Sequence, residues 1–158
     1  MIPSLETVIE IIALVVVLFH KRILVALGFG PKRLRDLIGI LSVGVFLLIV
    51  AYLRTHSVLS DHKELFAAGL ILGVPAGILT ATNMLKNIKD NVLYPRKSFG
   101  FYSTSGLGAA AGVGAFYFGY VTDFLSFAAG MSLTILTLLM FYIIRYEKRF
   151  GPVSLNRV

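Results

Sequence analysis

The 158-residue chain is 57% hydrophobic and only 15% charged, whereas a soluble domain is typically about 45–50% apolar and about 25% charged. The absence of cysteine excludes disulfides and thiolate metal or redox sites. A net charge of +7 would indicate nucleic-acid binding in a soluble protein. Here the apolar residues fall in long runs, which indicate a membrane protein, so we interpret the basic residues as topology signals and expect no nucleic-acid partner.

Five apolar segments predict an all-α, polytopic integral membrane protein, a bundle of five transmembrane helices in one domain. A helix needs about 20 apolar residues to cross a bilayer. The first segment differs from the others because it carries Glu6 and Glu10. It either crosses the membrane or lies on its surface, and we expect it to cross. The predicted spans are about 3–20, 36–54, 65–85, 99–122 and 124–144, followed by a basic tail over 145–158.

The distribution of charge predicts the orientation of this bundle. Five crossings place alternate loops on opposite sides, and one side then receives every basic residue except Arg54 and Lys63. By the positive-inside rule that side is cytoplasmic. We therefore expect the N-terminus outside and the C-terminus inside, in the plasma or cytoplasmic membrane. Four crossings, with the first segment on the surface, would change this alternation only at the N-terminus.

Glu10 is the ionisable residue that most strongly indicates a function, because it lies inside the first predicted span, one turn from Glu6. A carboxylate inside a membrane is costly and by default marks an ion or proton site. Two interpretations stay open. Glu10 binds a proton or a cation, or it lies close enough to the outer surface to be hydrated or paired with Arg54, which ends the second span on the same side.

The third segment has a small residue at every fourth position, and residues four apart share one helix face. Such a face lets helices approach closely in lipid, where apolar side chains add little driving force for association. Pro75 lies in the same segment and predicts a kink. Thr80 and Asn83, near its inner end, either line a small polar site or form hydrogen bonds between helices. The small-residue stripe consists of Gly69, Gly73, Gly77 and Ala81.

The fourth segment contains Gly106-x-Gly108-x-x-x-Gly112, which resembles a nucleotide-binding glycine loop. That motif needs a strand before it and an acidic residue about 20 residues later, whereas these glycines lie in an uninterrupted apolar run. We interpret them as a packing face and expect the third and fourth segments to form an antiparallel pair. The alternative is that each segment packs on another copy of the chain or on a partner. The face comprises Gly108, Gly112, Ala111, Ala115 and Gly119.

The loops carry the remaining polar chemistry. Basic residues of the inner loop either contact anionic lipid headgroups or act as topology determinants alone. They are Lys86, Lys89, Arg96 and Lys97. The outer loop holds metal-ligand residue types whose spacing matches no metal motif, so we predict no metal and no cofactor. They are His56, Asp61, His62 and Glu64.

Three classes of function follow from these features. The favoured class is a non-catalytic accessory or assembly subunit of a larger membrane complex, because the chain has small-residue packing faces, minimal loops and no catalytic set. The second is a small oligomeric transporter or channel for an ion or small solute, using Glu10 and a third helix broken at Pro75. The third is an enzyme that modifies a lipid or quinone. The expected partners are membrane lipids, with other membrane subunits or further copies of the chain.

Overall fold

The computed structural model describes residues 4–28, 33–94 and 99–155. Within these ranges the chain forms six helices and three two-residue strands, so the predicted helical class is confirmed. The helices are α1 (Leu5–Ala26), α2 (Leu34–Thr55), α3 (Val58–Asp61), α4 (Lys63–Lys86), α5 (Phe99–Tyr117) and α6 (Val121–Phe150). The strands are β1 (Ile88–Lys89), β2 (Val92–Leu93) and β3 (Ser154–Leu155).

Among the described residues, α2, α4 and α6 are long and apolar enough to cross a membrane, with mean hydropathies of 2.4, 1.9 and 2.1 over an 18-residue stretch of each. They correspond to the predicted spans over 36–54, 65–85 and 124–144. Five crossings and the orientation of the bundle remain predictions.

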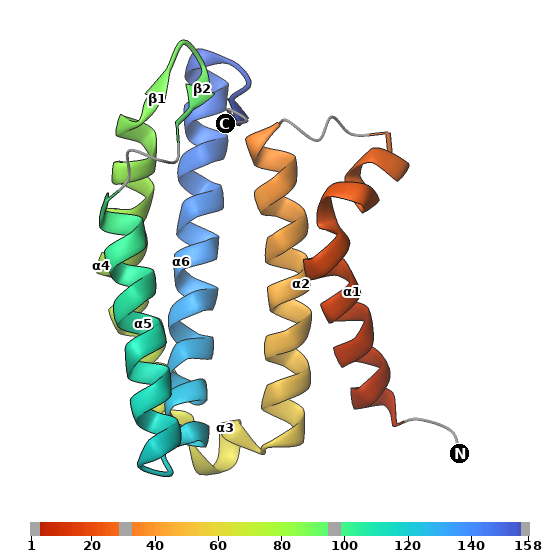
Figure 1. Ribbon diagram of the computed structural model, residues 1–158, viewed down its shortest axis with the longest axis vertical. Helices are drawn as coiled ribbons and strands as arrows, with labels where there is room; N and C mark the ends of the chain where they lie inside the picture. The colour runs from red at the N-terminus through yellow and green to blue at the C-terminus, as the bar shows by residue number, and fades with distance from the viewer. Residues whose placement is uncertain (1–3, 29–32, 95–98, 156–158) are drawn as a thin grey trace.

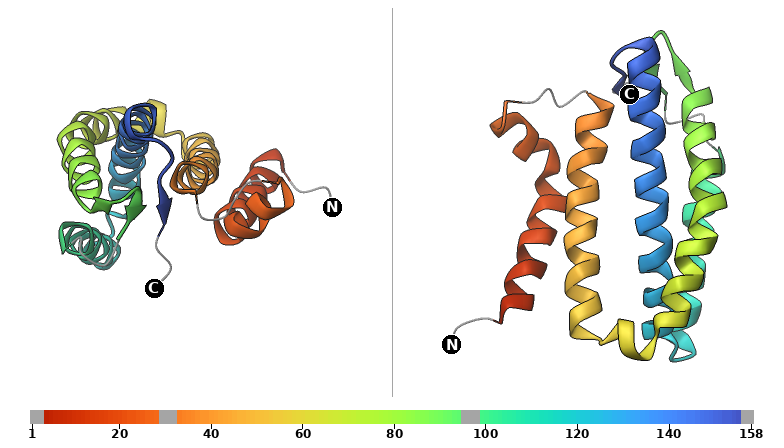
Figure 2. Two further views of the ribbon diagram at one scale, coloured as in Figure 1. Left: turned by 90° about the horizontal axis from the view of Figure 1, so that it is seen from above. Right: turned by 180° about the vertical axis from the view of Figure 1, so that it is seen from behind.

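The long helices lie side by side, with α2 and α6 at the centre (Figures 1 and 2). On one side α1 packs against α2, and on the other α4 packs against α6. The described part of α5 has sparse contacts with α4 and α6. The N-terminus and α3 lie at one end of the bundle, and the strands and the C-terminus lie at the other (Figure 1).

A small sheet that the sequence analysis did not predict closes the C-terminal end of the bundle. Strands β1 and β2 form an antiparallel hairpin, and β3 pairs with β2 in parallel. The two-residue turn is formed by Asp90 and Asn91, whose φ angles of 51° and 57° are of the kind that asparagine and aspartate tolerate. The amide of Leu34 donates a hydrogen bond to the carbonyl of Val153 at 2.9 Å, which joins the start of α2 to this end.

A kink at Pro75 stays a prediction, although the helix is not broken there. The α4 helix continues from Lys63 to Lys86 with Pro75 inside it, whereas interior non-helical dihedrals occur in α1 at Phe19 (φ −107°, ψ 15°). A proline removes the hydrogen bond to the carbonyl four residues earlier, here that of Ile71. Both residues are exposed, so the missing bond lies away from α6 and leaves the packing of α4 intact.

The expected pairing of the third and fourth segments is wrong, because α4 packs along α6 and has little contact with the described part of α5. The reason lies in α6, which carries its own small residue, Gly130, opposite Gly69. A Cβ on either glycine would run into the backbone of the other helix, at the carbonyl oxygen of Phe127 or of Phe66. The two backbones therefore touch at this crossing, as small residues permit in membrane helices.

Candidate functional site

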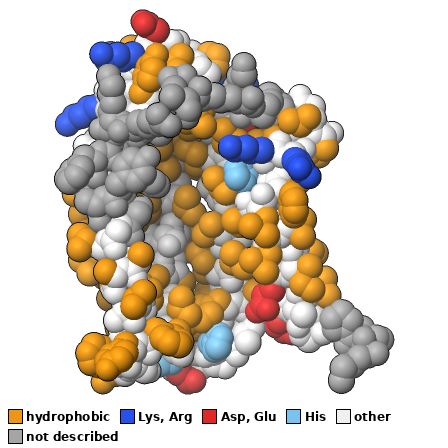
Figure 3. Space-filling view, viewed as in Figure 1, with side chains coloured by type: hydrophobic (Ala, Val, Ile, Leu, Met, Phe, Trp, Pro, Cys, Tyr) orange, Lys and Arg blue, Asp and Glu red, His pale blue; other side chains and the backbone are white. Residues whose placement is uncertain are grey.

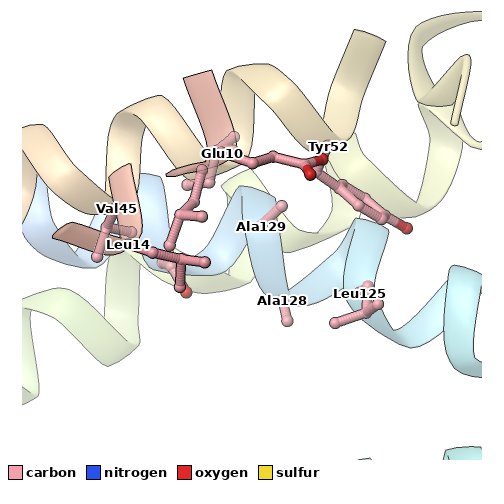
Figure 4. A pocket seen from close by; sticks show the side chains of 10 residues that line it. Glu10, Leu14, Val45, Tyr52, Leu125, Ala128 and Ala129 are labelled. Atoms are coloured by element: carbon pink, nitrogen blue, oxygen red, sulfur yellow. The ribbon is translucent and has the colours of Figure 1, made fainter. Parts of the chain in front are cut away.

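A pocket of about 480 Å³ lies between α1, α2 and α6, toward the end of the bundle that holds the N-terminus. Most of its walls are apolar, with Leu14 from α1, Leu48 from α2 and Leu125 from α6. Its polar lining residues are Glu10, Tyr52 and Ser132. Glu10 extends from α1 toward Tyr52 of α2 (Figure 4).

The start of α1 sets the position of Glu10. Ser4 caps the helix, since its Oγ accepts a hydrogen bond from the amide of Thr7 at 3.3 Å. Glu6 then falls in the first turn, and Glu10 follows one turn later on the same face. The two carboxylates have different surroundings. Glu6 Oε1 lies 3.6 Å from Arg54 Nη2, whereas Glu10 lines the pocket and has no ion pair or hydrogen bond among the described residues.

Tyr52 ties two walls of the pocket together. Its hydroxyl donates a hydrogen bond to the carbonyl of Thr122 at 2.9 Å and lies 3.3 Å from Ser126 Oγ. Ser126 is fully buried and donates its own hydrogen bond to Thr122 at 2.7 Å. Sequence reasoning missed Tyr52. The available signal was a tyrosine at the end of one apolar segment together with a hydroxyl residue near the start of another.

Thr80 and Asn83 do not belong to this pocket. They lie near the end of α4, at the opposite end of the bundle from Glu10 (Figure 1). The hydroxyl of Thr80 donates a hydrogen bond to the carbonyl of Ala76 at 2.8 Å, within its own helix. Asn83 is exposed. The structure therefore does not bring the four predicted residues of an ion site together, although Glu10 and Arg54 lie at the same end of the bundle.

The small-residue stripe of α4 is buried along its whole length, at Gly69, Gly73, Gly77 and Ala81. A Cβ on Gly73 would lie 2.7 Å from Thr134 Cβ, and one on Gly77 would lie 2.8 Å from Leu138 Cδ1. Thr134 also donates a hydrogen bond from Oγ1 to the carbonyl of Leu70 at 3.1 Å. The stripe is thus filled by α6 of the same chain.

The small-residue face of α5 has a different environment. A Cβ on Gly108 would meet no described atom within 4 Å, whereas one on Gly112 would lie 3.2 Å from Phe124 Cε1. Ala111 is exposed and Ala115 is half-buried. Gly119 adopts a positive φ of 79° in the turn that follows α5. Most of the predicted face is therefore open to the surroundings of the chain.

Basic side chains gather at the C-terminal end of the bundle (Figure 3). Lys86 and Lys89 are exposed there, while Arg96 and Lys97 lie outside the described residues. The sequence analysis overlooked a buried acid at this end. The side chain of Glu147 is only 6% exposed, and its Oε2 lies 4.0 Å from a nitrogen of both Arg33 and Arg35. Glu147 Oε1 also accepts a hydrogen bond from the amide of Val153 at 3.2 Å.

At the other end, His62 joins the start of α4 to the start of α6. Its Nδ1 lies 2.9 Å from Asp123 Oδ1. Within the ranges that the structure describes, no three or more His, Asp or Glu residues are grouped so that they could hold a metal ion.

Comparison with protein-family models, with curated proteins and with solved structures gives no match to this chain. Its function must therefore be argued from the packing surfaces and the pocket.

Proposed function

We propose that the protein is a non-catalytic accessory or assembly subunit of a larger membrane complex, and that α5 supplies the contact. The observation that carries this proposal is the open small-residue surface of α5. A Cβ on Gly108 would meet no described atom within 4 Å, and Ala111 on the same helix face is exposed. On other sides of α5 the side chains of Leu107 and Val113 are also exposed, at 73% and 70%.

The contrast between α4 and α5 supports this assignment. Membrane helices associate by close van der Waals approach, which small residues permit. The stripe of α4 already serves this purpose against α6 of the same chain, so it is not available to another protein. The face of α5 has the same composition and sparse contacts within the chain. It is the surface on which a helix of another membrane subunit, or of a second copy, would fit.

Gly108→Leu tests this proposal. The leucine fits the free chain but fills the surface that a partner helix would approach, so the complex dissociates while the helical content is kept. The particle mass in mild detergent, measured by light scattering, reports the loss of partners. Ala67→Leu is the matched control, because Ala67 is an exposed small residue of α4. Loss of assembly in both variants, or in neither, would count against α5 as the contact.

For the topology we propose five crossings, with the N-terminus outside and the C-terminus in the cytoplasm. In addition to α2, α4 and α6, this requires α1 and the segment over 99–122 to cross. In support, α1 runs alongside α2 instead of lying across the end of the bundle (Figures 1 and 2). The exposed Lys86 and Lys89 would then lie at the cytoplasmic headgroups of the plasma or cytoplasmic membrane.

The pocket favours a second candidate function, a small oligomeric transporter or channel. It places the carboxylate of Glu10 between three helices, and carboxylates at such positions are common in ion and proton pathways. In proteoliposomes, Glu10→Gln should then abolish solute-dependent flux while the fold persists. Unchanged flux would assign Glu10 a structural role only.

A further inference from the structure

The pocket between α1, α2 and α6 combines a size, an apolar lining and one carboxylate that together define a class of ligand. Its volume of about 480 Å³ falls in the range of small-molecule sites, about 300–1,000 Å³. We propose that it binds a lipophilic organic cation, such as an amine, quaternary ammonium or phosphonium carried on apolar groups. This inference goes beyond a subunit role, and it deepens the transport candidate by naming the ligand class for the same site.

Charge complementarity selects a cation. A carboxylate that faces apolar side chains is costly unless an opposite charge or hydrogen-bond donors compensate it. The cationic side chain of Arg54, at this end of the bundle, is already engaged because it lies beside Glu6. Among the described residues Glu10 has no such partner. An external positive charge would supply one.

Tyr52 adds a second attraction for an organic cation. Its hydroxyl is held by the carbonyl of Thr122 and lies beside Ser126, so the ring keeps a fixed place in the wall toward which Glu10 extends (Figure 4). His56 lies against the same ring, with centroids 4.7 Å apart. Aromatic faces attract ammonium groups within about 6 Å, most strongly where water is excluded.

The remaining lining selects an organic ion over a metal ion. A hard inorganic cation such as Ca²⁺ takes about six to eight oxygen ligands, whereas the described walls offer one carboxylate, the engaged hydroxyl of Tyr52 and Ser132. The other walls are aliphatic, with Leu14, Val45 and Ala128 among them. These surfaces suit the apolar body of a lipophilic cation. Because α1 packs mainly on α2, the pocket is open between α1 and α6 at the side of the bundle, where such a molecule would arrive from lipid.

Equilibrium binding of tritiated tetraphenylphosphonium to the full chain in neutral-lipid nanodiscs tests the proposal. We expect saturable binding to the wild type, without competition from triphenylphosphine oxide, which carries phenyl groups on phosphorus but no net charge. Glu10→Gln keeps the shape of the side chain and removes its charge, so affinity should fall by about tenfold or more. Ala128→Leu should also weaken binding, because the added side chain enters the pocket without changing its charge.

Glu64→Gln is the matched control, since Glu64 is an exposed acid in the first turn of α4, at the same end of the bundle, and does not line the pocket. It should bind tetraphenylphosphonium as the wild type does, and circular dichroism should show equal helicity in all variants. Equal affinity of Glu10→Gln and wild type, or equal competition by the uncharged oxide, would overturn the proposal. Phosphonium binding without flux would remove the transport candidate and leave the site standing. Flux of another solute without phosphonium binding would overturn the proposed cation site and leave the transport candidate standing.

Discussion

Gly69→Ala is expected to destabilise the bundle by about 1–2 kcal/mol, although alanine is the better helix former. The added Cβ would run into the carbonyl oxygen of Phe127 and lie 3.0 Å from the amide nitrogen of Met131. These are backbone atoms that cannot rotate away, so α4 and α6 must separate. Overpacking costs about 1–3 kcal/mol, and a clash with backbone atoms belongs in the upper part of that range, about 2–3 kcal/mol. The gain of about 1 kcal/mol from alanine in a helix then leaves the net loss stated above.

Gly108→Ala supplies the matched control for this prediction. A Cβ there meets no described atom within 4 Å, so only the gain in helix propensity remains, and the two variants should differ by about 2–3 kcal/mol. Thermal unfolding of the purified chain in mild detergent, followed by circular dichroism at helical wavelengths, measures the difference. A Gly69→Ala midpoint equal to or above that of Gly108→Ala would refute the close backbone contact.

Three further perturbations test other contacts. Tyr52→Phe removes one hydrogen bond between α2 and α6 and should cost about 1 kcal/mol, seen as a lower thermal midpoint; an unchanged midpoint would mean that the bond adds nothing. Glu147→Ala removes the acceptor of the Val153 amide and the acid beside Arg33 and Arg35, so amide hydrogen exchange over 151–155 should accelerate. Unchanged exchange would mean that Glu147 does not hold this segment in place. A cysteine at Ser60 should react with an impermeant thiol reagent from outside, and one at Lys148 should not; the reverse pattern would invert the proposed topology.

The helical spans were the most predictable part of the fold, because long apolar runs allow little else in a membrane. The burial of Gly69, Gly73 and Gly77 could also be expected from their spacing. The spacing did not predict which helix packs against these glycines. A small-residue stripe indicates close approach but carries no information on the partner, which is selected by features of α6 such as Gly130 and Thr134.

The small sheet could be predicted only in part. Its turn was predictable from Asp90-Asn91, because these two residues tolerate the left-handed backbone of a tight hairpin. The pairing of β2 with β3 joins Val92 to Ser154 across α5 and α6. Such a contact depends on how the whole bundle folds, so no local pattern predicts it.

The pocket was only partly predictable for the same reason. Glu10 stood out as an acid within an apolar segment, but Tyr52 and Thr122 are 70 residues apart, and their hydrogen bond depends on α2 packing against α6. The sequence did not decide whether Arg54 pairs with Glu6 or with Glu10, which lie one turn apart. The geometry assigns it to Glu6, which leaves Glu10 free to face the pocket.

The most direct test of the proposed subunit role is the composition of the particle that contains this chain after mild detergent extraction from its native membrane. Native mass spectrometry gives both the mass and the identity of everything bound. We expect a particle with defined protein partners, which Gly108→Leu reduces to the single chain. A wild-type chain that emerges alone, with the same mass as the Gly108→Leu variant, would contradict it.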